Sequence, residues 1–85
     1  MIWTVIVAKP AQKQLEKFPA KDQARIEAGL KAMAADPFSG DTLKLEGEKN
    51  RWRRRVGSYR NFFSADTVTR SVAVSAIVRR SSTTY

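Results

Sequence analysis

The chain has 85 residues and a formal net charge of +8, and 42% of its residues are hydrophobic. This length supports one modest core, because a chain of this size buries roughly 60–65% of its unfolded surface on folding. The chain contains no Cys, which excludes a disulfide scaffold, a zinc ribbon and a thiol nucleophile. It contains no His, which removes the commonest general base and metal ligand. No apolar run approaches the ~20 residues of a membrane span, and the N-terminus lacks a signal-peptide pattern. We therefore expect one cytoplasmic domain over residues 1–85, without a metal or other cofactor.

The first half of the chain predicts a strand followed by two helices. Residues 2–8 are mostly apolar and β-branched at both odd and even positions, which is typical of a strand buried on both faces. Apolar residues at positions 8, 11, 15 and 18 then form the stripe of an amphipathic helix that begins near Pro10 and ends before Pro19. A second helix is expected over residues 20–35, where Asp36-Pro37 stops it. We expect the mixed charges on the outer faces of this helical hairpin to be solvated.

The second half predicts strands. Residues 38–50 hold two glycines and an asparagine and are expected to be irregular. Residues 51–56 and 59–65 flank Gly57-Ser58, and a two-residue loop with Gly first fits a type II′ hairpin turn. Residues 70–78 alternate along their length and predict a last strand.

The fold class expected from this order is α+β, with the elements β-α-α-β-β-β. We expect a small, twisted, mainly antiparallel sheet with the helical hairpin packed on one of its faces.

The excess positive charge is confined to the end of the chain. Residues 1–48 carry seven basic and seven acidic side chains, whereas residues 49–85 carry nine basic side chains and one acidic side chain, Asp66. Eight of those nine are Arg, whose planar and permanently charged guanidinium fits phosphate oxygens. A focused basic surface of this kind indicates a nucleic-acid partner, whereas a generic solubility charge would be spread out and rich in Lys.

The predicted turn decides which side chains share a face of the hairpin, because directly opposed residues lie on the same face. One set is mostly apolar and aromatic, and we expect the helices to cover it and Trp52 and Tyr59 to belong to the core. It consists of Trp52, Arg54, Val56, Tyr59, Asn61 and Phe63. The other set forms an open basic face with one aromatic ring. It consists of Arg51, Arg53, Arg55, Arg60, Phe62 and Ser64.

Two interpretations of the open face compete. Arg55 opposes Arg60 there, and like charges in that position destabilise a sheet by up to ~1 kcal/mol. A bound polyanion would offset this cost. Alternatively, the arginines pair with carboxylates of the preceding loop, such as Glu46 or Glu48, although two carboxylates cannot neutralise the whole set. Phe62 could stack on a base or pack under the C-terminal tail.

The hairpin segment at residues 52–60 reads WRRRVGSYR, which has the pattern W-R-x-R-x-G-x-Y-R. On this motif the chain resembles the RelE toxins of the RelE/ParE superfamily of bacterial toxin–antitoxin systems, and the resemblance covers nearly the whole chain. The other similar segments are residues 11–19 (AQKQLEKFP), the second helix ending at Asp36-Pro37, residues 43–47 (LKLEG), residues 78–80 (VRR) and Tyr85.

The resemblance implies a β-α-α-β-β-β fold and ribosome-dependent cleavage of mRNA in the decoding site. It also implies neutralisation by a cognate antitoxin within a hetero-oligomer. The catalytic residues that it implies are Arg53, Arg55, Arg60, Arg80 and Tyr85. The additional RNA-binding residues that we expect are Lys49, Arg51, Phe62 and Arg79.

This chemistry needs neither His nor a metal, because RNA supplies its own nucleophile, the 2′-OH. Arg can orient the phosphate and neutralise its growing charge, but it stays protonated and cannot serve as the base. Tyr85 is therefore the candidate base, since neighbouring guanidinium groups favour its phenolate form. An Arg or a water could protonate the leaving oxygen.

The last strand leaves the roles of Arg79 and Arg80 to be assigned. Strict alternation places Arg79 with Ser75 and Ile77 on the face away from the main Val stripe. The family motif instead matches Arg80 as the catalytic residue, and a bulge at the strand end would reconcile the two. We assign catalysis to Arg80 and a phosphate contact to Arg79.

The sequence departs from the family where Arg54 and Asn61 replace apolar residues and where Phe63 replaces a frequent Tyr. Arg54 and Asn61 face each other in the predicted register, which indicates a local cross-strand contact at the margin of the core. Two alternative functions are a ParE-like inhibitor of DNA gyrase, which needs no cluster of phosphate-binding residues, and an attenuated RNA-binding protein that cuts nothing.

Overall fold

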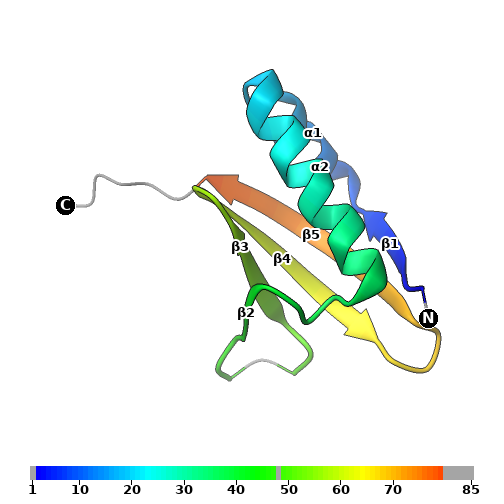
Figure 1. Ribbon diagram of the computed structural model, residues 1–85. Helices are drawn as coiled ribbons and strands as arrows, with labels where there is room; N and C mark the ends of the chain where they lie inside the picture. Colours follow the sequence, from blue (N-terminus) through cyan, green and yellow to red (C-terminus); the bar gives the residue numbers. More distant parts are fainter. Residues whose placement is uncertain (1, 48, 80–85) are drawn as a thin grey trace.

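The computed structural model describes residues 2–47 and 49–79 (Figure 1). Two helices, α1 (Lys9–Glu16) and α2 (Ala20–Ala35), lie on one face of a five-stranded sheet. The strand order is β1-β5-β4-β3-β2, in which β1 pairs with β5 in parallel and the other neighbours are antiparallel. The expected α+β class with a helical hairpin on one face is confirmed. The strands are β1 (Thr4–Val7), β2 (Asp41–Lys44), β3 (Trp52–Val56), β4 (Tyr59–Asp66) and β5 (Ser71–Arg79).

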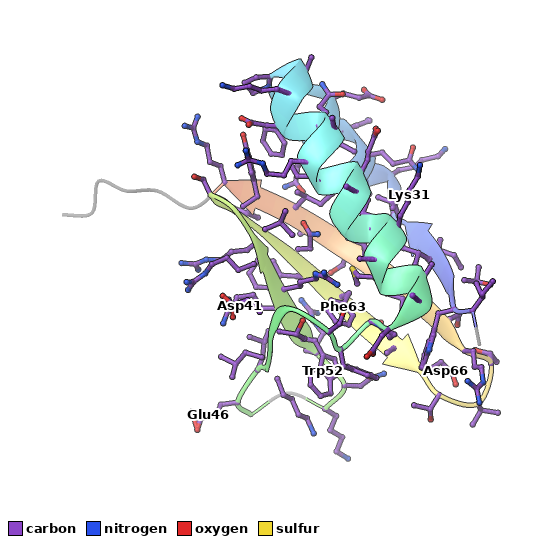
Figure 2. All side chains as sticks on the ribbon, viewed as in Figure 1. Lys31, Asp41, Glu46, Trp52, Phe63 and Asp66 are labelled. Atoms are coloured by element: carbon purple, nitrogen blue, oxygen red, sulfur yellow. The ribbon has the colours of Figure 1, made fainter. Side chains whose placement is uncertain are left out.

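The core lies between the helices and the sheet. Ile26 and Met33 of α2 meet Phe63 of β4, and all three are fully buried (Figure 2 labels Phe63). Full burial of an aliphatic or aromatic side chain stabilises a fold by roughly 1.5–3 kcal/mol. The remaining buried hydrophobic residues of the core are Ala11, Tyr59, Ala65, Val72, Val74 and Ile77.

The two helices begin and end where the sequence predicts. Pro10 lies in the first turn of α1, where the missing N–H costs no hydrogen bond. Pro19 is the N-cap of α2, and Asp36 ends that helix in an extended conformation before Pro37. Trp3 N–H donates to the carbonyl of Ala34 over 2.6 Å, which ties the chain before β1 to the end of α2.

The prediction that the first strand is buried on both faces is wrong. β1 is an edge strand, and Ile6 is 55% exposed because none of the described helices and strands covers the face away from α1 and α2. Apolar residues at both odd and even positions are typical of a central strand in a parallel sheet that has helices on both faces. In this fold the helices cover only one face of the sheet. No helix in residues 2–47 and 49–79 is long and apolar enough to cross a membrane.

Residues 38–50, predicted to be irregular, contain the short strand β2. Asp41–Lys44 pairs with β3 in antiparallel register, so that Asp41 opposes Arg55 and Leu43 opposes Arg53. Gly40 has a φ of +70° and leads the chain into this strand. Four residues, three of them exposed, carry too little alternation to be recognised, and the strand forms because β3 offers it backbone partners.

The β3–β4 hairpin has the predicted register. Trp52 opposes Phe63, Arg55 opposes Arg60, and Val56 opposes Tyr59. Gly57 has a φ of +58°, and the second turn residue, Ser58, has no positive φ. This pattern is what a type II′ turn requires.

Strand β5 departs from strict alternation. Phe62 pairs with Ala76 and Phe63 with Val74, so Ser75 is the extra residue of a β-bulge. Val74 and Ile77 are both fully buried as a result. The expectation that Ile77 lies on the face away from the Val stripe is therefore wrong, because the bulge reverses the side-chain alternation after Ser75.

Candidate nucleic-acid interface

The face of the sheet away from the helices carries the predicted arginines in regular rows. The cross-strand register brings together residues from β2, β3, β4 and β5. One row consists of Asp41, Arg55, Arg60 and Val78. The next row consists of Leu43, Arg53, Phe62 and Ala76. Arg51 directly precedes β3, and its carbonyl accepts a hydrogen bond from Leu45 N–H over 2.9 Å. We call Arg51, Arg53, Arg55 and Arg60 the arginine face.

The guanidinium groups of the arginine face are half-buried and short of hydrogen-bond acceptors. The Arg53 side chain is only 13% exposed. Each of the four arginines has one nitrogen that is buried from solvent without a hydrogen-bond partner in the described structure. These atoms are Arg51 Nε, Arg53 Nη1, Arg55 Nε and Arg60 Nε. Buried donors without acceptors are costly, and hydrogen bonds from an anion with several oxygens would offset that cost.

Asp41 is the carboxylate that lies against the arginine face. Its Oδ1 is 4.0 Å from Arg53 Nη1, and its Oδ2 is 3.7 Å from Arg55 Nε. A carboxylate from the segment before β3 does pair with the arginines, as the alternative interpretation expected, but it is Asp41 and not Glu46. Glu46 lies in the β2–β3 loop away from Asp41 and has no ion pair within residues 2–47 and 49–79 (Figure 2). Glu48, the other predicted partner, lies outside the described residues. Sequence analysis missed Asp41 because it begins the strand that was not recognised.

The helix-covered face of the hairpin holds two buried polar residues. Arg54 is 9% exposed and donates from Nη1 to Ser39 Oγ over 3.4 Å. Asn61 opposes Arg54, is fully buried, and has no hydrogen-bond partner for either Oδ1 or Nδ2 in the described structure. The two residues face each other as predicted. Asn61 nevertheless lies inside the core and not at its margin, and no hydrogen bond joins the pair.

Tyr59 is a core residue, as predicted. It is 2% exposed, and its hydroxyl donates to Asp22 Oδ2 over 2.8 Å. Burial raises the pKa of Tyr59, and its hydrogen bond to Asp22 raises that pKa further. Asp22 is thus half-buried and accepts a hydrogen bond from Tyr59. The expectation that the charged side chains of the helices are solvated is therefore wrong for this residue.

Trp52, which was expected to belong to the core, is partly buried and packs against the buried cluster. Its ring lies 4.8 Å from that of Phe38 and 6.5 Å from that of Phe63, measured between centroids. Lys44 Nζ lies 5.9 Å from the centre of the Trp52 ring.

Arg79 does not lie with the arginine face. It pairs with Tyr59 across β4 and β5, on the side that the helices cover, because the bulge at Ser75 reverses the alternation. Its expected contact with the same RNA phosphates is therefore not supported by its position.

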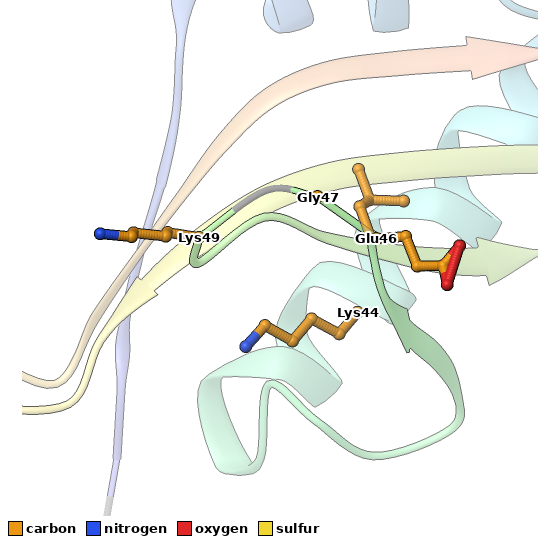
Figure 3. Close-up of a pocket in the computed structure, with 5 residues that line it drawn as sticks. Lys44, Glu46, Gly47 and Lys49 are labelled. Carbon is orange, nitrogen blue, oxygen red and sulfur yellow. The ribbon is translucent and has the colours of Figure 1, made fainter.

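Lys49 lies outside the cross-strand rows that hold the arginine face, in the loop between β2 and β3. It lines a shallow hollow of about 490 Å³ together with Lys44, Leu45, Glu46 and Gly47 (Figure 3). Lys49 is exposed and reaches solvent on this side of the loop.

Several solved structures share this architecture. No protein-family model and no curated protein sequence matches the chain. The toxin of the archaeal RelE–RelB complex from Pyrococcus horikoshii is 23% identical, with a TM-score of 0.85 over 98% of this chain and 100% of that chain. The toxin–antitoxin complex RelBE2 from Mycobacterium tuberculosis gives 22% identity and a TM-score of 0.83 over 94% of this chain and 100% of that chain. The isolated RelE toxin of Escherichia coli gives 14% identity and a TM-score of 0.80 over 95% of this chain and 87% of that chain. The chain has the RelE fold.

The RelE fold brings together part of the predicted site. Arg53, Arg55, Arg60 and Phe62 share the open face, and Arg51 adjoins it. Arg80 and Tyr85, the other two predicted catalytic residues, lie outside the described residues. Within residues 2–47 and 49–79, no three His, Cys, Asp or Glu residues are grouped so as to hold a metal ion.

Proposed function

We propose that this chain is the toxin of a type II toxin–antitoxin system and that it cleaves mRNA on the ribosome. The observation that carries this proposal is the arginine face. Four guanidinium groups with unpartnered, buried N–H donors line the open side of β3 and β4. A face of this kind suits an RNA backbone, whose successive phosphates supply both the charge and the acceptors.

Cleavage follows from holding one phosphodiester in line for attack. The 2′-oxygen forms a bond to phosphorus while the bond from phosphorus to the 5′-oxygen breaks. A base takes the 2′-hydroxyl proton, and the leaving 5′-oxygen receives a proton. Arg53, Arg55 and Arg60 would orient the phosphate and offset the charge that grows on its oxygens in the transition state. Tyr85 is the proposed base.

Phe62 adds a base-stacking element to this face. It lies in the same row as Arg53 and directly opposes it across β3 and β4. A half-buried ring between guanidinium groups can support a nucleobase, and stacking of this kind contributes about 1–3 kcal/mol per base.

The cognate antitoxin would neutralise the toxin by covering the arginine face. The structures from Pyrococcus horikoshii and Mycobacterium tuberculosis are complexes of a toxin with its antitoxin. The antitoxin for this chain should carry an acidic or amphipathic segment, because the face that it covers is strongly basic.

The test is a cleavage assay mapped by primer extension. The purified full chain is incubated with mRNA in the presence and in the absence of programmed ribosomes. We expect cuts within the reading frame only when ribosomes are present. An absence of cuts in both conditions would contradict the proposal, and an assay of gyrase supercoiling would then test the ParE-like alternative.

Arg60→Ala provides the mutational arm of the same assay. We expect it to slow cleavage by about 100-fold or more, because loss of one donor to a transition-state oxyanion typically has an effect of that size. Lys31→Ala is the control, since it removes one positive charge from the exposed side of α2 and should cleave like the parent. Equal cleavage by the parent and Arg60→Ala would refute the role of the arginine face.

A further inference from the structure

Asp41 makes an unusual contact with the arginine face. It opposes Arg55 in the β2–β3 register, and its two carboxylate oxygens point to different guanidinium groups. The distances are 4.0 Å to Arg53 Nη1 and 3.7 Å to Arg55 Nε, and both exceed hydrogen-bond length. These are the same two nitrogens that are buried without a hydrogen-bond partner. The carboxylate therefore brings negative charge close to Arg53 and Arg55 without accepting a hydrogen bond from either guanidinium group.

The carboxylate is also weakly held. The Asp41 side chain is 56% exposed, and within the described residues it accepts no hydrogen bond from any backbone or side-chain donor. By contrast, the carboxylate of Asp66 accepts hydrogen bonds from the backbone N–H groups of Val68 and Thr69. Exposed ion pairs without hydrogen bonds contribute little to folding. The fold thus gains little from the position of Asp41, whereas the charge of the arginine face depends on it.

We propose that Asp41 is an internal competitor for phosphate, which occupies the position between Arg53 and Arg55 until RNA displaces it. This inference rests on the proposed function and adds a specificity-determining residue to it. A phosphodiester offers two anionic oxygens that can approach Arg53 Nη1 and Arg55 Nε to hydrogen-bond distance, which the carboxylate does not reach. Exchange of one anion for the other leaves the charge between these two arginines unchanged. A ligand gains most when further phosphates also meet Arg51 and Arg60, so the site favours a continuous RNA backbone over an isolated anion.

The test measures the affinity of the full chain for a fluorescent single-stranded RNA with 2′-O-methyl groups throughout, which the proposed chemistry cannot cut. Asp41→Asn keeps the shape of the side chain and removes its charge. We expect it to bind this RNA about two- to fivefold more tightly, the range that corresponds to one exposed ion pair. Glu27→Gln is the matched control, because it makes the same change in net charge on the exposed side of α2 and should leave affinity unchanged.

Arg55→Ala separates the two proposals. If Arg55→Ala weakens binding while Asp41→Asn leaves it equal or weaker, the competitor role is wrong and the RNA-binding face stands. If Arg55→Ala leaves binding unchanged, the arginine face does not bind RNA and both proposals fail. Thermal melting establishes that each variant is folded, and Asp41→Ser replaces Asp41→Asn if the latter is not. Equal gains for Glu27→Gln and Asp41→Asn would also overturn the competitor role, since net charge alone would then explain the effect.

Discussion

Asn61 is the residue whose burial is hardest to explain by packing alone. It is on the central strand β4, opposite Arg54, and neither polar atom of its amide has a hydrogen-bond partner in the described structure. A buried amide without partners typically reduces stability by about 1–3 kcal/mol relative to an apolar group of the same shape. The position therefore carries a stability cost that an apolar residue would avoid.

Asn61→Leu should raise the free energy of unfolding by about 1–2 kcal/mol, because Leu has the same branching without polar atoms. Urea denaturation monitored by circular dichroism measures the change. Asn61→Val is a smaller variant that separates overpacking from the loss of a polar contact. If both variants are less stable than the parent, the amide has a partner, such as a buried water, and the explanation is wrong.

Tyr59 joins the hairpin to α2 through its hydrogen bond to Asp22. Its ring also lies 4.5 Å from that of Phe18, measured between centroids. Burial, followed by the hydrogen bond to Asp22, raises its pKa in the folded state above the ordinary value near 10. The folded state therefore favours the neutral phenol more strongly than the unfolded state does.

The sign of the pH dependence follows from this shift. The contribution of Tyr59 to the free energy of unfolding is fully present below its pKa in the unfolded state, near 10. It is lost as the pH rises through its pKa in the folded state. We expect Tyr59→Phe to be less stable than the parent at pH 8, with a difference that shrinks above pH 10. Urea denaturation at pH 8, 9 and 10.5 measures it. A difference that stays constant across this range would show that the shift does not affect folding.

At the scale of elements, the β3–β4 hairpin places the arginine face. Its turn requires a positive φ at Gly57, and the register that follows sets Arg55 against Arg60. A one-residue slip would move every side chain to the other face, and the arginines would then point into the core. The turn glycine thus contributes to the site indirectly, by setting the register that places the arginines on one face.

Gly57→Ala should lower the free energy of unfolding by about 1 kcal/mol, because an L-residue is strained at φ +58°. The added Cβ would also lie 3.2 Å from Arg25 Nη1, although that flexible side chain can move away. Ser58→Ala is the control, since it keeps the turn backbone and should change stability little. Equal stability of Gly57→Ala and the parent in thermal melts would show that the turn does not need glycine.

At the scale of the whole molecule, the two faces of the sheet differ in their residues and in their exposure. The helices cover one face and supply the core, as Figure 1 shows, and no helix or strand among residues 2–47 and 49–79 covers the other face. Residues 1–48, whose acidic and basic side chains are equal in number, contain both helices. The strands that follow, β3, β4 and β5, carry the excess of arginine. Changes to stability and changes to the proposed RNA binding should therefore come from different faces, and the control substitutions for binding and cleavage accordingly lie on α2.

Much of this arrangement could be predicted from residues close together in the sequence. The apolar stripe and the flanking prolines determine both ends of α2, and Gly57-Ser58 determines the hairpin register. The separation of Arg53 and Arg55 from Trp52 and Arg54 follows from that register, because alternation along a strand is a local property. The helices, the hairpin and the core of the candidate site were thus determined by the sequence itself.

The remainder depended on contacts between distant segments. β2 exists because β3 offers it backbone partners, so Asp41 could not be placed beside Arg53 and Arg55 from its own sequence. The bulge at Ser75 arises in the pairing of β5 with β4, and it moves Ile77 into the core and Arg79 away from the arginine face. The exposure of Ile6 reflects the position of β1 at the sheet edge. Tertiary structure decided these features, because strand order, bulges and the covering of a face are set by the partner strands and helices and not by local propensity.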